Sequence, residues 1–136
     1  RSLCDWSSDV CSSDLWLGIE VVEVKPGFCK LKMQIRKEML NGFGIAHGGI
    51  TYSLADSALA FASNSHGRQS VSVETSISHT VSLKEGDVVY AVSEEKSISH
   101  KIGIYLITIT NQNDQTVALF KGVVYRTSKD WFPQEI

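Results

Sequence analysis

One stretch of thirteen residues, 71–83, restricts the possible folds more than any other part of the chain. Its odd positions are mostly apolar, and its even positions are serine, threonine or glutamate. This period of two predicts a β-strand with one buried face. At about 3.3 Å per residue the strand would be roughly 43 Å long, which is long for a chain of 136 residues. Another element must therefore cover a long apolar face.

Five further stretches alternate in whole or in part between apolar and polar residues, and they predict strands: residues 17–24, 28–36, 88–96, 102–110 and 117–125. Turn residues separate them, among them Lys25-Pro26-Gly27 and Lys84-Glu85-Gly86-Asp87. A single helix is expected between the second and third strands. The order β-β-α-β-β-β-β predicts an α+β fold in which an antiparallel sheet of about six strands and one helix bury each other.

The expected helix runs from Ile50 to about Ser65, a stretch rich in alanine that contains neither proline nor glycine. Its apolar residues recur at helical spacing, and Gly67 follows as a stop signal. Between Glu38 and Arg68 the only charged residue is Asp56, in the middle of this helix. A carboxylate in so apolar a helix either lies on a thin exposed stripe of polar residues or is buried for a function.

The tripeptide His47-Gly48-Gly49 comes directly before the helix. Backbone N–H groups at a helix start have no partner within the helix, and the helix dipole there favours an anion. Two glycines let a ligand approach those N–H groups closely, so the tripeptide could form an oxyanion hole. The alternative is a simple turn with His47 as a capping residue.

Residues 1–15 differ from the rest of the chain. Residues 6–10 are nearly repeated as residues 11–15, without helical or strand periodicity. The segment resembles a translated sequencing-adapter read-through; the alternative is a genuine N-terminal arm. We therefore expect residues 1–15 to lie outside the fold and residues 16–136 to form one domain.

Charge and composition exclude several classes of protein. Thirteen basic against fifteen acidic residues give a net charge of −2, so we expect no nucleic-acid partner. No apolar run reaches the roughly 18 residues of a spanning helix, and none resembles a signal peptide, so we expect no membrane association. The three cysteines lack CxxC spacing, which argues against a disulfide framework or a zinc site and favours the cytoplasm.

Four motifs together resemble the hot-dog-fold acyl-CoA thioesterases, in particular the PaaI-like group associated with phenylacetic acid degradation: Leu40-Asn41-Gly42, His47-Gly48-Gly49, Ser53-Leu54-Ala55-Asp56 and Asn64-Ser65. Residues 111–112 and 117–122 resemble the last turn and strand of that group. The likeness extends from about residue 17 to residue 126. It implies a long antiparallel sheet wrapped around a central helix, and homodimers, assembled further into homotetramers, with active sites at the subunit interface.

The resemblance also implies roles for five residues. Asp56 would be the general base or the nucleophile that attacks the thioester carbonyl. The backbone N–H of Gly48 or Gly49 would hold the oxyanion, Asn41 would position the nucleophile or the thioester, and His47 would brace the loop. Direct and water-mediated attack by Asp56 remain equally open.

Four further residues are candidates for substrate binding. Ser72 matches the place where some thioesterases of this group have a water-positioning serine. Lys96, His100 and Lys101 could meet the phosphates of coenzyme A, although a solvated basic turn explains them equally well. No metal site is expected, because the histidines and Asp56 lack ligand spacing.

The expected reaction is hydrolysis of an acyl-CoA thioester, with an aryl-acetyl group such as (hydroxy)phenylacetyl as the acyl moiety. No cofactor is expected, because coenzyme A is part of the substrate. The alternative is a non-catalytic acyl-CoA-binding protein of the same fold, since a fold alone does not determine function. A binding protein has no need for a lone acid beside the Gly48-Gly49 loop, so Asp56 favours the enzyme.

Overall fold

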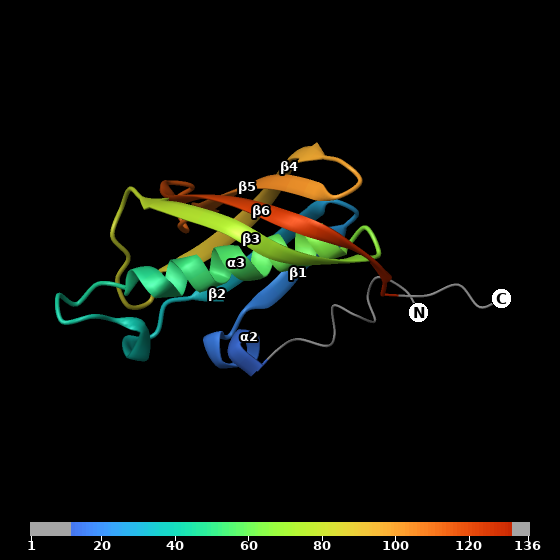
Figure 1. Ribbon diagram of the computed structural model, residues 1–136. Helices are drawn as coiled ribbons and strands as arrows, with labels where there is room; N and C mark the ends of the chain where they lie inside the picture. The colour runs from blue at the N-terminus through green and yellow to red at the C-terminus, as the bar shows by residue number, and fades with distance from the viewer. Residues whose placement is uncertain (1–11, 132–136) are drawn as a thin grey trace.

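A computed structural model describes residues 12–131 of the chain. Two α-helices, a short 3₁₀ helix and six strands follow one another in this order: α2 (Ser12–Leu17), β1 (Glu20–Lys25), β2 (Phe28–Gln34), η1 (Lys37–Met39), α3 (Gly48–Asn64), β3 (Arg68–His79), β4 (Val88–Ile98), β5 (Ile102–Thr110) and β6 (Thr116–Asp130). The strands form one sheet in the order β1-β2-β4-β5-β6-β3, with every pair antiparallel. Figure 1 shows α3 lying along the concave side of this sheet.

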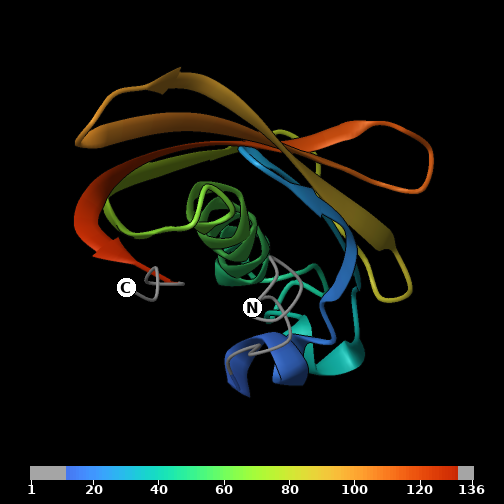
Figure 2. The ribbon, with the colours of Figure 1, turned by 90° about the vertical axis from the view of Figure 1, so that its right-hand side faces the viewer.

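The sheet curves around α3 on three sides, as the view along the helix shows (Figure 2). The inward residues of β2, β4, β5 and β6 and the apolar face of α3 form a single core. Helix and sheet are in close contact at Gly122 of β6, where an added Cβ would lie 2.5 Å from Cδ2 of the buried Leu59. The predicted α+β fold of six strands around one helix is therefore confirmed.

The long strand differs from its prediction at both ends. β3 begins at Arg68 and ends at His79, whereas the alternation predicted a strand over residues 71–83. The continuation is lost because Thr80 and Val81 both donate their backbone N–H to the Val117 carbonyl. Residues 80–83 therefore leave the sheet and turn toward the N-terminus of α3.

The expected buried face of this strand is not formed at Val71 and Val73. β3 is an edge strand, and Val71 and Val73 are 55% and 60% exposed. A bulge between Ser72 and Glu74 changes which residues face α3: Ser70 and Ser72 line a hollow beside the helix before the bulge, and Thr75 contacts Tyr52 of the helix after it. The alternation in the sequence is unbroken, but the bulge moves the inward face from even-numbered to odd-numbered residues and leaves Val71 and Val73 outside.

The expectation for residues 1–15 falls mostly outside the described residues. Residues 12–15 form the first part of α2, and Asp14 there is buried with its carboxylate accepting a hydrogen bond from Ser57 of α3 (2.5 Å). Leu17, at the end of α2, belongs to the core. Within residues 12–131, neither helix is long and apolar enough to cross a membrane.

Candidate active site

The first turn of α3 leaves one backbone donor free. His47 is the N-cap, and its Nδ1 accepts a hydrogen bond from the Gly49 N–H (2.9 Å). The Ile50 N–H donates to the His47 carbonyl. Among the described residues, nothing accepts a hydrogen bond from the Gly48 N–H. Of the two glycines proposed from sequence for an oxyanion hole, the geometry therefore favours Gly48 as the donor.

Both glycines are required by close neighbours. A Cβ on Gly48 would lie 3.2 Å from Cε1 of His79, and a Cβ on Gly49 would lie 3.0 Å from Nδ1 of His47. Side chains at either position would push on an imidazole ring, so the backbone stays open to a ligand only with glycine.

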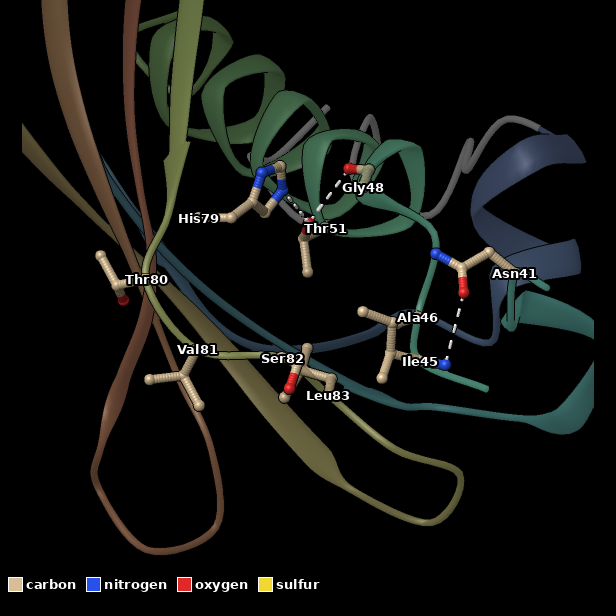
Figure 3. Close-up of a pocket in the computed structure, with 10 residues that line it drawn as sticks. All are labelled: Asn41, Ile45, Ala46, Gly48, Thr51, His79, Thr80, Val81, Ser82 and Leu83. Atoms are coloured by element: carbon tan, nitrogen blue, oxygen red, sulfur yellow. Dashed lines mark hydrogen bonds between the residues drawn. The ribbon is translucent and has the colours of Figure 1, made fainter. Parts of the chain in front are cut away.

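Asn41 is held beside this turn by its own loop. Its Oδ1 accepts from the backbone N–H of Phe43 (2.9 Å) and of Ile45 (3.5 Å), and its backbone N–H donates to the Ile45 carbonyl. The side-chain oxygen is thereby engaged, and the amide nitrogen points toward Gly48 (Figure 3). Asn41 can therefore offer a second donor next to the Gly48 N–H.

A cavity of about 330 Å³ opens in front of these two donors. It lies between the N-terminus of α3, the Asn41 loop and the segment that follows β3 (Figure 3). Its walls mix polar and apolar side chains: Asn41, Ile45, Ala46, Gly48, Thr51, His79, Thr80, Val81, Ser82 and Leu83. The cavity is large enough for a small acyl group.

Asp56 lies two turns farther along α3, outside this cavity. It is half-buried and lines a separate small hollow together with Ser70 and Ser72 of β3. The structure thus brings Ser72 close to Asp56. Burial, and then the nearby Asp14 carboxylate, raise the pKa of Asp56 above its ordinary value.

Gly48 and Asp56 are eight positions apart, which corresponds to about 12 Å along the helix axis. Hydrolysis needs the attacking group and the carbonyl within about 3–3.5 Å of each other. A thioester held by Gly48 is therefore out of reach of Asp56 in the same chain.

The predicted phosphate-binding residues lie elsewhere. Lys96 is near the end of β4, where its Nζ pairs with Glu94 (2.6 Å). His100 and Lys101 occupy the turn between β4 and β5, at the end of the molecule opposite the N-terminus of α3 (Figure 1). All three are exposed, and none lines the cavity or the hollow beside Asp56.

Thr51 and His79, which contact each other in the cavity, have no role predicted from the sequence. His79, the last residue of β3, places its Nε2 2.7 Å from Oγ1 of Thr51 on α3. The alternation of residues 71–83 put His79 on the inward face, but nothing in the sequence indicated that its partner would be Thr51.

Within the described part of the chain, no three His, Cys, Asp or Glu side chains lie close enough together to hold a metal ion. Cys29 is buried in the core, and burial raises the pKa of its thiol to about 12. The thiol is therefore protonated at neutral pH and is not a nucleophile.

A six-stranded antiparallel sheet around one central helix, with a free backbone amide at the helix start facing a cavity, defines a hot-dog-fold protein of the thioesterase type. Residues 43–118 match the pattern of the Thioesterase superfamily. The chain belongs to this superfamily and is a PaaI-like thioester hydrolase.

Three known proteins illustrate the relationship. A putative esterase of Archaeoglobus fulgidus is 39% identical over 117 residues, 86% of this chain and 76% of the relative. The acyl-coenzyme A thioesterase PaaI of Escherichia coli is 36% identical over 121 residues, 89% of this chain and 85% of its own. The structure of E. coli PaaI, from the phenylacetic acid degradation operon, matches with a TM-score of 0.90 at 32% identity and covers 93% of this chain and 92% of that one.

The third of these proteins, after those of A. fulgidus and E. coli, is a Streptococcus mutans protein whose structure was solved with acetyl-CoA bound. It matches with a TM-score of 0.80 at 27% identity, over 82% of this chain and 90% of that chain. The resemblance stated from the motifs, to the PaaI-like thioesterases, is thereby confirmed.

Proposed function

We propose that the protein hydrolyses acyl-CoA thioesters to a free acid and coenzyme A, with aryl-acetyl groups such as phenylacetyl as the acyl moiety. One observation carries the proposal: the free Gly48 N–H at the start of α3 faces a cavity of about 330 Å³. The E. coli relative, an acyl-coenzyme A thioesterase, and the acetyl-CoA-bound S. mutans neighbour support this substrate class.

The chemistry follows from the donors around Gly48. Attack on a thioester carbonyl places negative charge on its oxygen. The Gly48 N–H, the Asn41 amide nitrogen and the positive end of the α3 dipole would all stabilise that charge. Because the Asn41 loop and the helix cap hold these donors in place before substrate arrives, little reorganisation is needed during the reaction.

Asp56 would supply the base or the nucleophile. Its raised pKa makes the ionised carboxylate a stronger base than an ordinary aspartate. Ser72 lines the same hollow, so its hydroxyl could position the water that Asp56 activates. In direct attack the carboxylate would expel the thiolate of coenzyme A and form an anhydride with the acyl group, and water would then cleave this anhydride to the free acid and restore Asp56.

The separation of Gly48 and Asp56 leads us to propose a homodimer with composite sites. The free edge of β3 is available for pairing with β3 of a second copy. Ser72 lies in the first half of this strand, near Asp56, and His79 lies at the end of the strand, beside Gly48. An antiparallel pairing about a two-fold axis near Thr75 would therefore bring Asp56 of one protomer toward Gly48 of the other.

Two such dimers would form the homotetramer by a second interface. The outer face of the sheet carries large apolar side chains that are about 40–50% exposed: Ile102, Leu106, Leu119 and Tyr125. Exposed apolar groups gathered on one sheet face are typical of a surface that another protein covers.

Thiol release from phenylacetyl-CoA, followed with a thiol reagent across a panel of aryl and aliphatic acyl-CoAs, tests the activity. Tight binding of acyl-CoA without thiol release would instead support the non-catalytic binding protein.

Mixing two inactive variants tests the composite site. If Gly48 of one chain works with Asp56 of the other, random dimers of Gly48→Val and Asp56→Asn chains should recover about a quarter of wild-type activity, because half of them contain one intact site of two. A site within one chain predicts no recovery, since every site would carry a defect.

A further inference from the structure

The imidazole of His79 has no part in the reaction proposed above, although it lies directly beside Gly48. Its Cε1 would be 3.2 Å from a Cβ on Gly48, and its Nδ1 would be 3.8 Å from the same point. His79 also lines the cavity in front of the Gly48 N–H (Figure 3). A molecule bound to that N–H must therefore pass close to the ring.

The hydrogen bonds around Thr51 determine which ring nitrogen carries the proton. The Thr51 hydroxyl donates its single hydrogen to the Gly48 carbonyl (3.1 Å), which can only accept. With the hydroxyl hydrogen directed to that carbonyl, Nε2 of His79, 2.7 Å from the same hydroxyl oxygen, is the donor of the second bond. In the neutral ring the proton is on Nε2, and Nδ1 is an acceptor. Within residues 12–131 no donor reaches Nδ1.

The position of Nδ1 limits the part of a substrate that it can meet. A thioester whose carbonyl oxygen accepts from Gly48 has its first acyl carbons next to that residue. Both ring nitrogens lie within 4 Å of the Cβ position of Gly48, Nε2 at 3.6 Å and Nδ1 at 3.8 Å, so the ring is nearer to those first carbons than to the far end of the acyl chain.

We infer that His79 is a specificity-determining residue that accepts, through Nδ1, a hydrogen bond from a hydroxyl group on the second or third carbon of the acyl moiety. Thr51 fixes the tautomer that makes this possible. The inference rests on the proposed function, and it adds a substrate class to it: short hydroxyacyl-CoA thioesters.

The size of the preference follows from the acceptor that an unsubstituted acyl group would leave unpaired. A site that hydrogen-bonds a substrate hydroxyl discriminates against the analogue that lacks it, and the discrimination is smaller where the polar atom can bond to water instead, as the exposed His79 can. Since this cavity is open on one side, we expect a preference of about ten- to hundredfold in kcat/KM, below that of fully enclosed sites.

The test compares two matched pairs of substrates, 3-hydroxybutyryl-CoA against butyryl-CoA and 4-hydroxyphenylacetyl-CoA against phenylacetyl-CoA. Each ratio of kcat/KM is measured for the wild type and for His79→Gln and His79→Asn. The glutamine amide can replace Nε2 as the partner of Thr51 but places nothing at Nδ1, whereas the asparagine amide places a polar group near Nδ1. His66→Gln, at the other end of α3, is the matched control.

We expect the 3-hydroxybutyryl preference to fall about ten- to hundredfold in His79→Gln. It should be partly retained in His79→Asn and unchanged in His66→Gln. Equal losses for both members of each pair, with the ratios preserved, would overturn the inference, because His79 would then only position the first turn of α3. A change confined to the 4-hydroxyphenylacetyl pair would also overturn it, since the ring would then contact the far end of the acyl group. If the wild type releases thiol from none of the four substrates, the proposed function itself fails, and the role of His79 with it.

Discussion

The substitution Asp56→Asn separates catalysis from folding in this protein. It keeps the size and shape of the side chain and removes only its charge and its basic oxygen. No donor among residues 12–131 makes a side-chain hydrogen bond to the Asp56 carboxylate, so the change breaks no contact that holds α3 in place. The pocket around Gly48 is two turns away and is left intact.

The expected effects on rate and stability have opposite signs. Loss of a general base lowers the rate by about 10² to 10⁴-fold, and loss of a nucleophile by more. Affinity for acyl-CoA should change little, because Gly48 and the cavity hold the thioester. The folded chain binds the Asp56 proton more tightly than the unfolded chain, so above the folded pKa the ionised carboxylate opposes folding. Asparagine should therefore preserve or raise the melting temperature at neutral pH.

The assay is thiol release from phenylacetyl-CoA at saturating substrate, together with melting curves over a range of pH. The stability gain of Asp56→Asn should disappear below the ordinary aspartate pKa of 3.8, where the carboxyl group is protonated in both folded and unfolded chains. Ser53→Ala, on an exposed hydroxyl of the same helix, is the control and should leave turnover near the wild-type value. Retention of more than about a tenth of normal turnover by Asp56→Asn would refute the catalytic role.

Three other predictions concern the fold and its pH dependence. Gly122→Ala should cost about 1–3 kcal/mol in a denaturant melt, because its Cβ would lie 2.5 Å from a methyl group of the buried Leu59; an unchanged midpoint would contradict this close contact. Burial alone would raise the pKa of Glu95, but hydrogen bonds from a tyrosine and a histidine outweigh burial and lower that pKa. Glu95→Gln should therefore be less stable than the wild type by about 1 kcal/mol near neutral pH. This difference in stability should vanish as the pH falls through the pKa of Glu95 in the folded chain. Removal of residues 1–15 should lower the melting temperature, because the buried Asp14 carboxylate no longer bonds Ser57, and should shift the acidic limb of the pH–rate profile to lower pH, because an acidic neighbour of Asp56 is lost. An unchanged melting temperature would contradict the packing of α2 against α3.

The periodicity of the sequence was enough to predict the architecture. The alternation in the strands and the helical spacing over residues 50–65 identify the apolar face of each element, and the core is built from those faces. The limits of β3 and the exposure of Val71 and Val73 were not predictable in this way. They depend on the bulge between Ser72 and Glu74 and on the position of the strand at the edge of the sheet, and neither changes the sequence pattern.

The candidate site shows a similar division. Asn41, Gly48 and Asp56 could be selected from the motif, and their positions on loop and helix followed from the local pattern. The choice between Gly48 and Gly49 could not be made from sequence, since it depends on the rotamer of His47 and the hydrogen bond that this rotamer allows. For the same reason the tautomer of His79 becomes definable only once Thr51 is known to be its neighbour.

The bare edge of β3 also has a consequence for the newly made chain. As soon as a protomer folds, twelve residues of strand with exposed valines offer unpaired backbone groups to any other extended segment nearby. The first encounter then decides between assembly with an identical chain and aggregation. Overexpression at high temperature, where unfolded chains are abundant, should expose this weakness first. A charged residue in place of Val71 or Val73 would protect the edge from aggregation at the expense of assembly.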